Sequence, residues 1–169
     1  MPLLQRLRFG HAPALLAFER ENRAYFAVSV PDRGDDYFAH FDARHRELMA
    51  GQAAGLHFFH VVVGDSGEVL GRVNLIDVAD GSAELGYRIA EQATGRGLAT
   101  AAVHEVCALA ATEYGLTTLR AVTTLDNAGS RAVLARTGFV PTGDLRLDGR
   151  PGLRHVRNLA GVSAPQRDA

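Results

Sequence analysis

Apolar residues in the first half of the chain recur first at helical spacing and then at strand spacing. Residues 12–26 and 35–51 each place apolar side chains three or four positions apart, and Pro31 and Gly34 indicate a turn between them. Three apolar or β-branched runs follow, at 56–63, 69–78 and 82–90. Because short turns rich in glycine and aspartate separate these runs, the pattern predicts two helices and then an antiparallel meander of three strands.

The second half of the chain opens with an apolar stripe through residues 97–114, which predicts a long amphipathic helix that ends at Gly115. Four shorter elements are expected after it: a strand at 119–124, a helix at 128–137, and a pair of strands at 139–147 and 153–159. This order predicts a mixed α/β (α+β) architecture. We expect one domain over residues 1–160 and a flexible tail over residues 161–169.

Composition narrows the class of protein without identifying it. Of the 169 residues, 47% are hydrophobic and 22% are charged, as in ordinary soluble domains, and no apolar stretch reaches the roughly 20 residues that a membrane-spanning helix needs. A net charge of −1, with arginines scattered along the chain, argues against a nucleic-acid partner. The single cysteine, Cys107, excludes an internal disulfide, and the absence of an apolar leader favours the cytoplasm.

The loop between the third strand and the long helix is the first candidate for a binding site. Its glycines, in Gln92-x-x-Gly95-x-Gly97, permit backbone conformations and close approaches that side chains would block. The first turn of the helix follows with Leu98, Ala99 and Thr100. Its free N–H groups and the positive end of the helix dipole suit a diphosphate, and Arg96 would add charge at the rim.

Two other phosphate-binding motifs compete for this loop. A Walker A loop requires a lysine, and all eighteen basic residues of this chain are arginine. A dinucleotide fingerprint requires a third glycine where Thr100 stands, and a βαβ unit rather than an antiparallel meander. A lone glycine loop is more often a simple turn at the start of a helix, so its ligand depends on the motifs around it.

A second motif opens the later helix with Asn127-x-x-Ser130 and closes it with Gly138-Phe139. Together with the glycine loop and the strand Glu84-Leu-Gly-Tyr-Arg-Ile before it, this motif resembles the GNAT family of N-acetyltransferases, most of all its ribosomal-protein alanine acetyltransferases. The resemblance implies a mostly antiparallel twisted sheet, splayed at the coenzyme site and flanked by helices. It also implies acetyl-CoA as cosubstrate.

The chain departs from the pattern of this branch in two places. Thr142-Gly143 stands where the branch usually carries Glu-Gly, and the last hairpin reads Gly152-Leu-Arg-His-Val where an aspartate usually leads into the final strand. Both departures concern the amine-binding side, which can therefore differ from that of the best-studied members.

The resemblance implies which residues hold the coenzyme. In the family, the backbone of the strand before the loop pairs with the pantetheine arm, and Arg88 and Ile89 occupy that position here. A backbone N–H at this position would stabilise the oxyanion of the transition state. The residues implied at the diphosphate are Gln92, Gly95, Arg96, Gly97, Leu98, Ala99 and Thr100.

Two residues at the start of the later helix have both a structural and a functional interpretation. Ser130 would lie near the departing sulfur, where its hydroxyl can protonate the thiolate. The alternative is that this serine has only a structural role at the N-terminus of the helix. Asn127 is a good N-cap residue, and we expect it to cap the helix and contact the coenzyme as well.

The acceptor amine is protonated near neutral pH, so direct attack on the thioester requires a base, reached directly or through water. Glu84 is the first candidate, against the alternative of a surface glutamate on a strand. Asp148 and His155, in the final hairpin, are weaker candidates. Cys107 is expected to pack in the core. The seven histidines show no ligand spacing, so we predict no metal.

The expected function is therefore transfer of an acetyl group from acetyl-CoA to a primary amine. The favoured acceptor is the N-terminus of a protein or peptide. A small amine such as an antibiotic or a polyamine is the alternative within enzymes, although the first two helices lack the acidic cluster that a polycation would need. A non-catalytic acyl-CoA binding module is the alternative outside enzymes. The partners expected are acetyl-CoA and an amine acceptor, without nucleic acid or membrane, and a homodimer is left open.

Overall fold

The computed structural model describes residues 1–162. Within them, seven strands form one sheet in the order β1-β2-β3-β4-β5-β7-β6. The strands are β1 (Leu3–Arg6), β2 (Phe58–Val63), β3 (Val69–Ala79), β4 (Ser82–Ile89), β5 (Thr118–Thr124), β6 (Val140–Leu147) and β7 (Arg150–Asn158). The α-helices are α1 (Ala12–Glu21), α2 (Arg23–Ala27), α3 (Asp35–Ala39), α4 (Phe41–Ala53), α5 (Leu98–Thr112) and α6 (Ala128–Arg136). Short 3-10 turns occupy Phe9–His11 and Glu91–Ala93.

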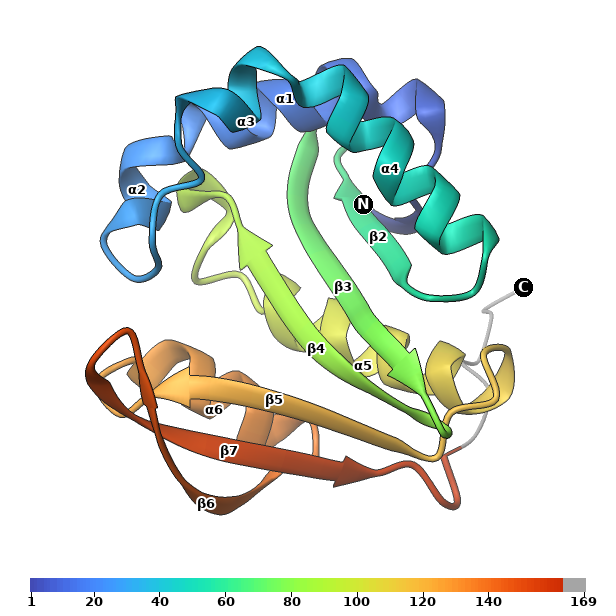
Figure 1. Ribbon diagram of the computed structural model, residues 1–169, viewed down its shortest axis with the longest axis vertical. Helices are drawn as coiled ribbons and strands as arrows, with labels where there is room; N and C mark the ends of the chain where they lie inside the picture. The colour runs from blue at the N-terminus through green and yellow to red at the C-terminus, as the bar shows by residue number, and fades with distance from the viewer. Residues whose placement is uncertain (163–169) are drawn as a thin grey trace.

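The helices lie in two layers, one on each face of the sheet. Helices α1 to α4 gather over β2, β3 and β4, and α5 and α6 lie behind the sheet (Figure 1). Alternation along the strands separates the two faces, because successive side chains point in opposite directions. Val73, Leu75 and Leu85 are buried in the core, whereas Arg72 on β3 and its register partner Arg88 on β4 face α1. The predicted mixed α/β architecture is confirmed.

Each of the two predicted N-terminal helices is interrupted. The first ends at Asn22, whose buried side chain donates to the Phe18 carbonyl at 2.9 Å and accepts from the Glu91 backbone N–H at 2.9 Å. Because the side-chain amide competes with the backbone for the Phe18 carbonyl, the chain leaves the helix there and restarts as α2. The second predicted helix is divided into α3 and α4 at His40, which has φ −115° and ψ 27°.

One strand was missed by the sequence prediction, and another begins three residues earlier than predicted. Strand β1 was not predicted, because four residues with no alternation of burial give no strand signal, and its partner β2 lies more than fifty residues away. Strand β7 begins at Arg150 rather than at residue 153. Asp148 and Gly149 have φ of 50° and 77°, so they form a two-residue turn of the primed type that brings the strands together earlier. Of the predicted tail, residues 163–169 lie outside the described part of the chain.

The central feature of the sheet is the parting of β4 and β5. These strands are parallel and pair only from Ser82 to Glu84, opposite Thr118 to Arg120. Beyond that point β4 continues to Ile89 paired with β3, while β5 continues to Thr124 paired with β7. The two strands diverge towards one end of the molecule, as Figure 1 shows. The predicted sheet, mostly antiparallel and splayed, is confirmed.

A buried glutamate joins the helical layer to this sheet. Glu19 of α1 is 1% exposed and pairs with Arg72 at 2.8 Å, with Arg33 at 3.1 Å and with Arg88 at 3.3 Å. Burial by itself raises the pKa of Glu19. The charges of the arginines, Arg72 first, lower it by more than burial raises it, so the pKa lies below its usual value. Glu19 is therefore ionised and connects α1 to β3, to β4 and to the segment before α3.

Replacing Glu19 by glutamine is expected to destabilise the fold by about 3 kcal/mol at pH 7, because it leaves buried guanidinium groups without their counter-charge. Urea unfolding measures this, with Glu21→Gln on the exposed side of α1 as the matched control. Since the pKa of Glu19 is lowered from 4.5, its contribution is complete above that pH and is lost as the pH falls through the lowered value. Equal stability of the two variants at pH 7 would contradict this role.

Candidate active site

The glycine loop forms an open cradle at the start of α5. Gly95 and Gly97 have φ of 76° and 74°, which L side chains rarely adopt, and a Cβ on either would project into open space. No side chain caps the helix at Gly97, so the N–H groups of its first turn are left for a ligand. Residues of this turn line a cavity of about 510 Å³, here called the loop cavity. It suits an anionic, extended ligand.

Strand β4 forms one wall of the loop cavity through Tyr87, Arg88 and Ile89. Because β5 has separated from β4 after Glu84, the edge of β4 that faces β5 is not paired to that strand over these residues. An extended ligand can therefore pair with this edge as an added strand would. The predicted position of Arg88 and Ile89 at a coenzyme site agrees with this geometry.

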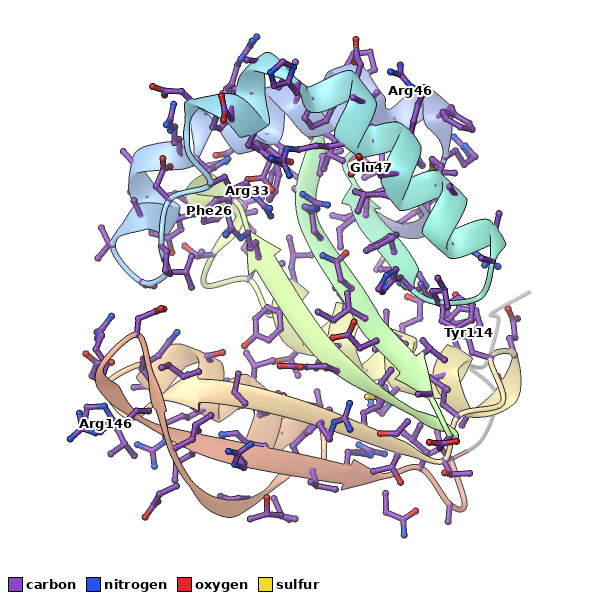
Figure 2. The ribbon with its side chains drawn as sticks, in the orientation of Figure 1. Phe26, Arg33, Arg46, Glu47, Tyr114 and Arg146 are labelled. Atoms are coloured by element: carbon purple, nitrogen blue, oxygen red, sulfur yellow. The ribbon has the colours of Figure 1, made fainter. Side chains whose placement is uncertain are left out.

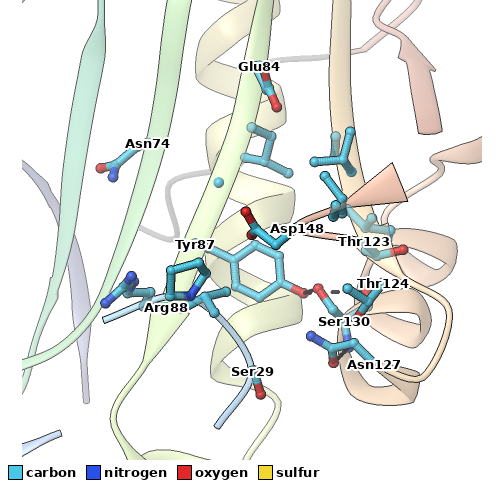
Figure 3. Close-up of a pocket in the computed structure, with 18 of the residues that line it drawn as sticks. Ser29, Asn74, Glu84, Tyr87, Arg88, Thr123, Thr124, Asn127, Ser130 and Asp148 are labelled. Atoms are coloured by element: carbon cyan, nitrogen blue, oxygen red, sulfur yellow. Dashed lines mark hydrogen bonds between the residues drawn. The ribbon is translucent and has the colours of Figure 1, made fainter. Parts of the chain in front are cut away.

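Helix α6 forms the opposite wall and carries the second motif. The Asn127 side chain accepts the Ser130 backbone N–H at 3.1 Å, so the predicted N-cap is confirmed. The Ser130 hydroxyl lies 2.7 Å from the Tyr87 hydroxyl across the parted strands, and Figure 3 shows the two side chains pointing toward each other. Burial raises the pKa of Tyr87, an effect that the hydrogen bond to Ser130 partly opposes, so Tyr87 remains protonated at neutral pH.

A second cavity of about 550 Å³ opens on the other side of this hydroxyl pair. It is lined by Glu84 of β4, by Asn74 of β3 and by Asp148 of the β6–β7 turn, and we call it the hairpin cavity (Figure 3). The residues that line both cavities are Ser29, Val30, Tyr87, Arg88, Asn127 and Ser130. Two ligands, one from each cavity, can therefore meet at the Tyr87–Ser130 pair.

Most of the residues predicted at the coenzyme border a single cavity. Those that line the loop cavity are Arg88, Ile89, Gly95, Gly97, Leu98, Ala99, Thr100, Asn127 and Ser130. Gln92 and Arg96 are not among its lining residues: the Arg96 guanidinium donates to the Gln92 carbonyl at 2.9 Å on the exposed side of the loop. Their part in binding stays a prediction.

The three candidate bases lie in two different places. Glu84 and Asp148 both line the hairpin cavity. His155 does not: it is buried in β7, its Nε2 lies 2.9 Å from the Thr123 hydroxyl, and burial followed by the charge of Arg131 lowers its pKa. His155 is thus placed as a neutral partner of Thr123, behind the cavity wall.

Two other sequence predictions concern groups away from the cavities. Cys107 is buried in α5, and burial raises the pKa of its thiol to about 11, which agrees with a packing role. Among residues 1–162 no group of three or more potential ligands is arranged to hold a metal ion.

Sequence reasoning assigned no role to several residues that line the cavities. Tyr87 was considered only as part of the strand motif before the loop, and Phe26 only as the last residue of the first predicted helix. Both line the loop cavity, and Figure 2 shows Phe26 near Arg33. Alternation in β4 could have placed Tyr87 on the face opposite Arg88. No local signal points to Arg33, which reaches the hairpin cavity from the segment between α2 and α3.

Residues 3–140 match the family model of the acetyltransferase (GNAT) domain. The chain belongs to the GNAT family of acetyltransferases. It is accordingly an N-acetyltransferase that uses acetyl-CoA as its cosubstrate, and the extended coenzyme suits the loop cavity, with its uncapped helix and its unpaired β4 edge. No curated protein matches the chain.

Solved GNAT structures share the whole fold. The ribosomal-protein-S5-alanine acetyltransferase of Vibrio fischeri is 19% identical, with a TM-score of 0.88 over 96% of this chain and 99% of that one. RimJ of Mycobacterium smegmatis, solved with a CoA disulfide, is 27% identical, with a TM-score of 0.81 over 92% and 80%. A spermidine N-acetyltransferase chimera that includes the Vibrio cholerae enzyme is 19% identical, with a TM-score of 0.76 over 94% and 96%. GNAT enzymes with different acceptors thus share this architecture.

Replacing Gly97 by valine is expected to weaken acetyl-CoA binding on the order of tenfold or more, because a side chain would occupy the cradle and strain the loop. Calorimetric titration measures the dissociation constant. Gly115→Val is the matched control, since Gly115 also has a positive φ of 67° with open space around it but follows the far end of α5. Unchanged affinity in a folded Gly97→Val protein would remove the loop from the coenzyme site.

Proposed function

We propose that this GNAT enzyme acetylates the amino terminus of a protein or peptide by direct attack in a ternary complex. The observation that carries the proposal is the meeting of two cavities at the Tyr87–Ser130 pair, one beside the glycine loop and one open to the opposite side. The hairpin cavity is large enough for the first residues of a peptide. Likeness to enzymes whose names specify ribosomal-protein substrates supports this acceptor class, while the spermidine enzyme represents the alternative of a small amine.

On this proposal the loop and β4 orient the thioester. The N–H groups at the start of α5 hold the diphosphate, and the free edge of β4 at Arg88 and Ile89 pairs with the pantetheine arm. A backbone N–H of that edge faces the carbonyl oxygen and stabilises the charge that develops on it. These contacts place the carbonyl carbon at the junction of the cavities, where the amine arrives.

The Ser130 hydroxyl protonates the departing sulfur in this scheme. When the amine nitrogen bonds to the carbonyl carbon and the carbon–sulfur bond breaks, the electron pair goes to sulfur, which takes up a proton. The Tyr87 hydroxyl, 2.7 Å from Ser130 Oγ, can replace the proton that Ser130 gives up. Tyr87 would then be part of the same relay.

Glu84 is the proposed base for the incoming ammonium. It lies three residues before Tyr87 on β4, a separation of about 10 Å along an extended strand, so the proton is transferred through water within the hairpin cavity. Asp148 lines the same cavity and is the second candidate.

The proposal also concerns the location and the oligomeric state of the protein. No helix within residues 1–162 is long and apolar enough to cross a membrane. A cytoplasmic location agrees with that finding and stays a prediction, as does a homodimer.

The direct test of the acceptor is a coenzyme-release assay with peptides of varied amino termini beside aminoglycosides and polyamines. Turnover of the small amines alone would overturn the peptide proposal.

Replacing Ser130 by alanine is expected to lower kcat on the order of 10²-fold while leaving the acetyl-CoA dissociation constant nearly unchanged, since the hydroxyl acts in the transition state. The helix cap is preserved, because Asn127 accepts from the Ser130 backbone N–H. Single-turnover rates and calorimetry on the same preparation separate the two effects. Tyr87→Phe should show a smaller loss of rate. If turnover of Ser130→Ala matches wild type, Ser130 serves only the helix start.

Replacing Glu84 by glutamine keeps the size of the side chain and removes the proton acceptor. The rate is expected to fall most at low pH, where free amine is scarcest, while coenzyme affinity is retained. The measurement is the pH–rate profile with one accepted peptide, beside Glu47→Gln on the exposed side of α4 as control. An unaltered acidic limb and maximal rate would exclude Glu84, and the same measurement on Asp148→Asn would then test the second candidate.

A further inference from the structure

The charges that line the hairpin cavity are unequal in number. Four arginines reach it, from the α2–α3 segment, from β3, from β4 and from the start of β7: Arg33, Arg72, Arg88 and Arg150. Only two carboxylates line the same cavity, Glu84 and Asp148. Arg150 is paired with Asp126, which lies outside the cavity lining. The unbalanced positive charge therefore lies at the end of the cavity formed by Arg33, Arg72 and Arg88.

Glu19 balances only part of this charge. It is a single carboxylate behind the cavity wall, shared by Arg33, Arg72 and Arg88, so these three arginines exceed it by two charges. Each guanidinium gives Glu19 one N–H group out of five, which leaves donors for a further anion. Burial first, and then repulsion by Arg33, lowers the pKa of Arg88, as expected where cations crowd together.

The charges are also ordered along β4. Glu84, Gly86 and Arg88 share one face of the strand, with the negative and positive ends about 13 Å apart along the backbone. Between them, a Cβ on Gly86 would meet nothing within 4 Å, so the cavity floor is open there. Its register partner Asn74 has a buried Oδ1 without a hydrogen-bond donor among residues 1–162. Along this line the cavity is thus bordered by a carboxylate, by an amide whose buried oxygen has no donor, and by a group of guanidiniums.

We propose that the preferred acceptors carry a carboxylate on one of their first two residues. Resting on the proposed function, this inference places the amine toward Glu84 and the junction, the backbone of the acceptor past Asn74, and the acidic side chain against Arg33 and Arg88. Two extended residues span about 7 Å, and the arginine side chains cover the remaining distance.

The arrangement argues against the opposite class of acceptor. A polyamine would bring further positive charges toward Arg33, Arg72 and Arg88, which exceed Glu19 by two charges, and like charges brought together in a partly buried site cost binding energy. A purely structural interpretation, in which the arginines only fix α1 to the sheet, accounts for Arg72, which is 4% exposed. It does not require Arg33, whose side chain is 28% exposed, to line the cavity as well.

The test uses peptides that are identical except for their first two residues: Asp-Ala against Asn-Ala, and Ala-Asp against Ala-Asn. Each pair changes a carboxylate to an amide of the same shape. We expect kcat/KM to be on the order of tenfold higher for the acidic member of at least one pair, the scale of one charge-assisted hydrogen bond. Equal values in both pairs, with turnover present, would overturn the inference and leave the proposed function standing.

A variant shows whether the arginines cause the preference. Arg33→Gln removes the most exposed cation of the Glu19 group, and we expect it to reduce the acidic-over-neutral ratio severalfold. Arg46→Gln makes the same change on the exposed side of α4, away from both cavities, and is expected to keep the wild-type ratio (Figure 2). An unchanged ratio in Arg33→Gln would assign the preference to another part of the protein.

A binding measurement covers the case in which no peptide is turned over. Calorimetry with the N-acetylated forms of the Ala-Asp and Ala-Asn peptides, in the presence of CoA, needs no catalysis. Tighter binding of the acidic product would support the charged cavity even if the proposed function failed. Equal or absent binding of both products would contradict the inference directly.

Discussion

The site depends on one constraint, the early end of pairing between β4 and β5. Three residues of each strand are joined, and beyond them each strand keeps only its outer neighbour. The backbone N–H and C=O groups at this unpaired edge would cost free energy if they were buried without hydrogen bonds. They therefore have to meet water or a ligand. The same separation lets Tyr87 reach across to Ser130 and leaves room for a cavity on either side. An uninterrupted sheet would have neither the edge nor the junction.

The parting also explains why the two cavities differ in character. The loop cavity is bounded by backbone, by small residues and by a helix start, which suits a ligand recognised through phosphate and amide groups. The hairpin cavity is bounded by long charged side chains that converge from four segments of the chain. On the proposed assignment, the coenzyme common to all members is held by the backbone. The acceptor, which differs between members, meets side chains, and these change more easily from one sequence to another.

The difference determines how much could be predicted from the sequence. The lining of the loop cavity was predictable, because glycines and a helix start follow one another directly and Asn127-x-x-Ser130 is equally local. The break of the first helix at Asn22 was not, since it depends on a hydrogen bond to Glu91, 69 residues away. The arginines of the hairpin cavity are likewise scattered in the chain and become neighbours only once β3 and β4 pair in register. Local motifs were visible, and sites assembled by long-range contacts were not.

The ion-pair group around Glu19 limits how this enzyme could acquire a different acceptor during evolution. The arginines that face the hairpin cavity also anchor α1 to the sheet, so exchanging Arg72 or Arg88 for a neutral residue would weaken the fold together with the binding surface. Mutational paths to new acceptors therefore run first through positions that carry no such double role. Residues 28–31, between α2 and α3, and the turn at Asp148 are two such places, because they border the cavity from exposed connections.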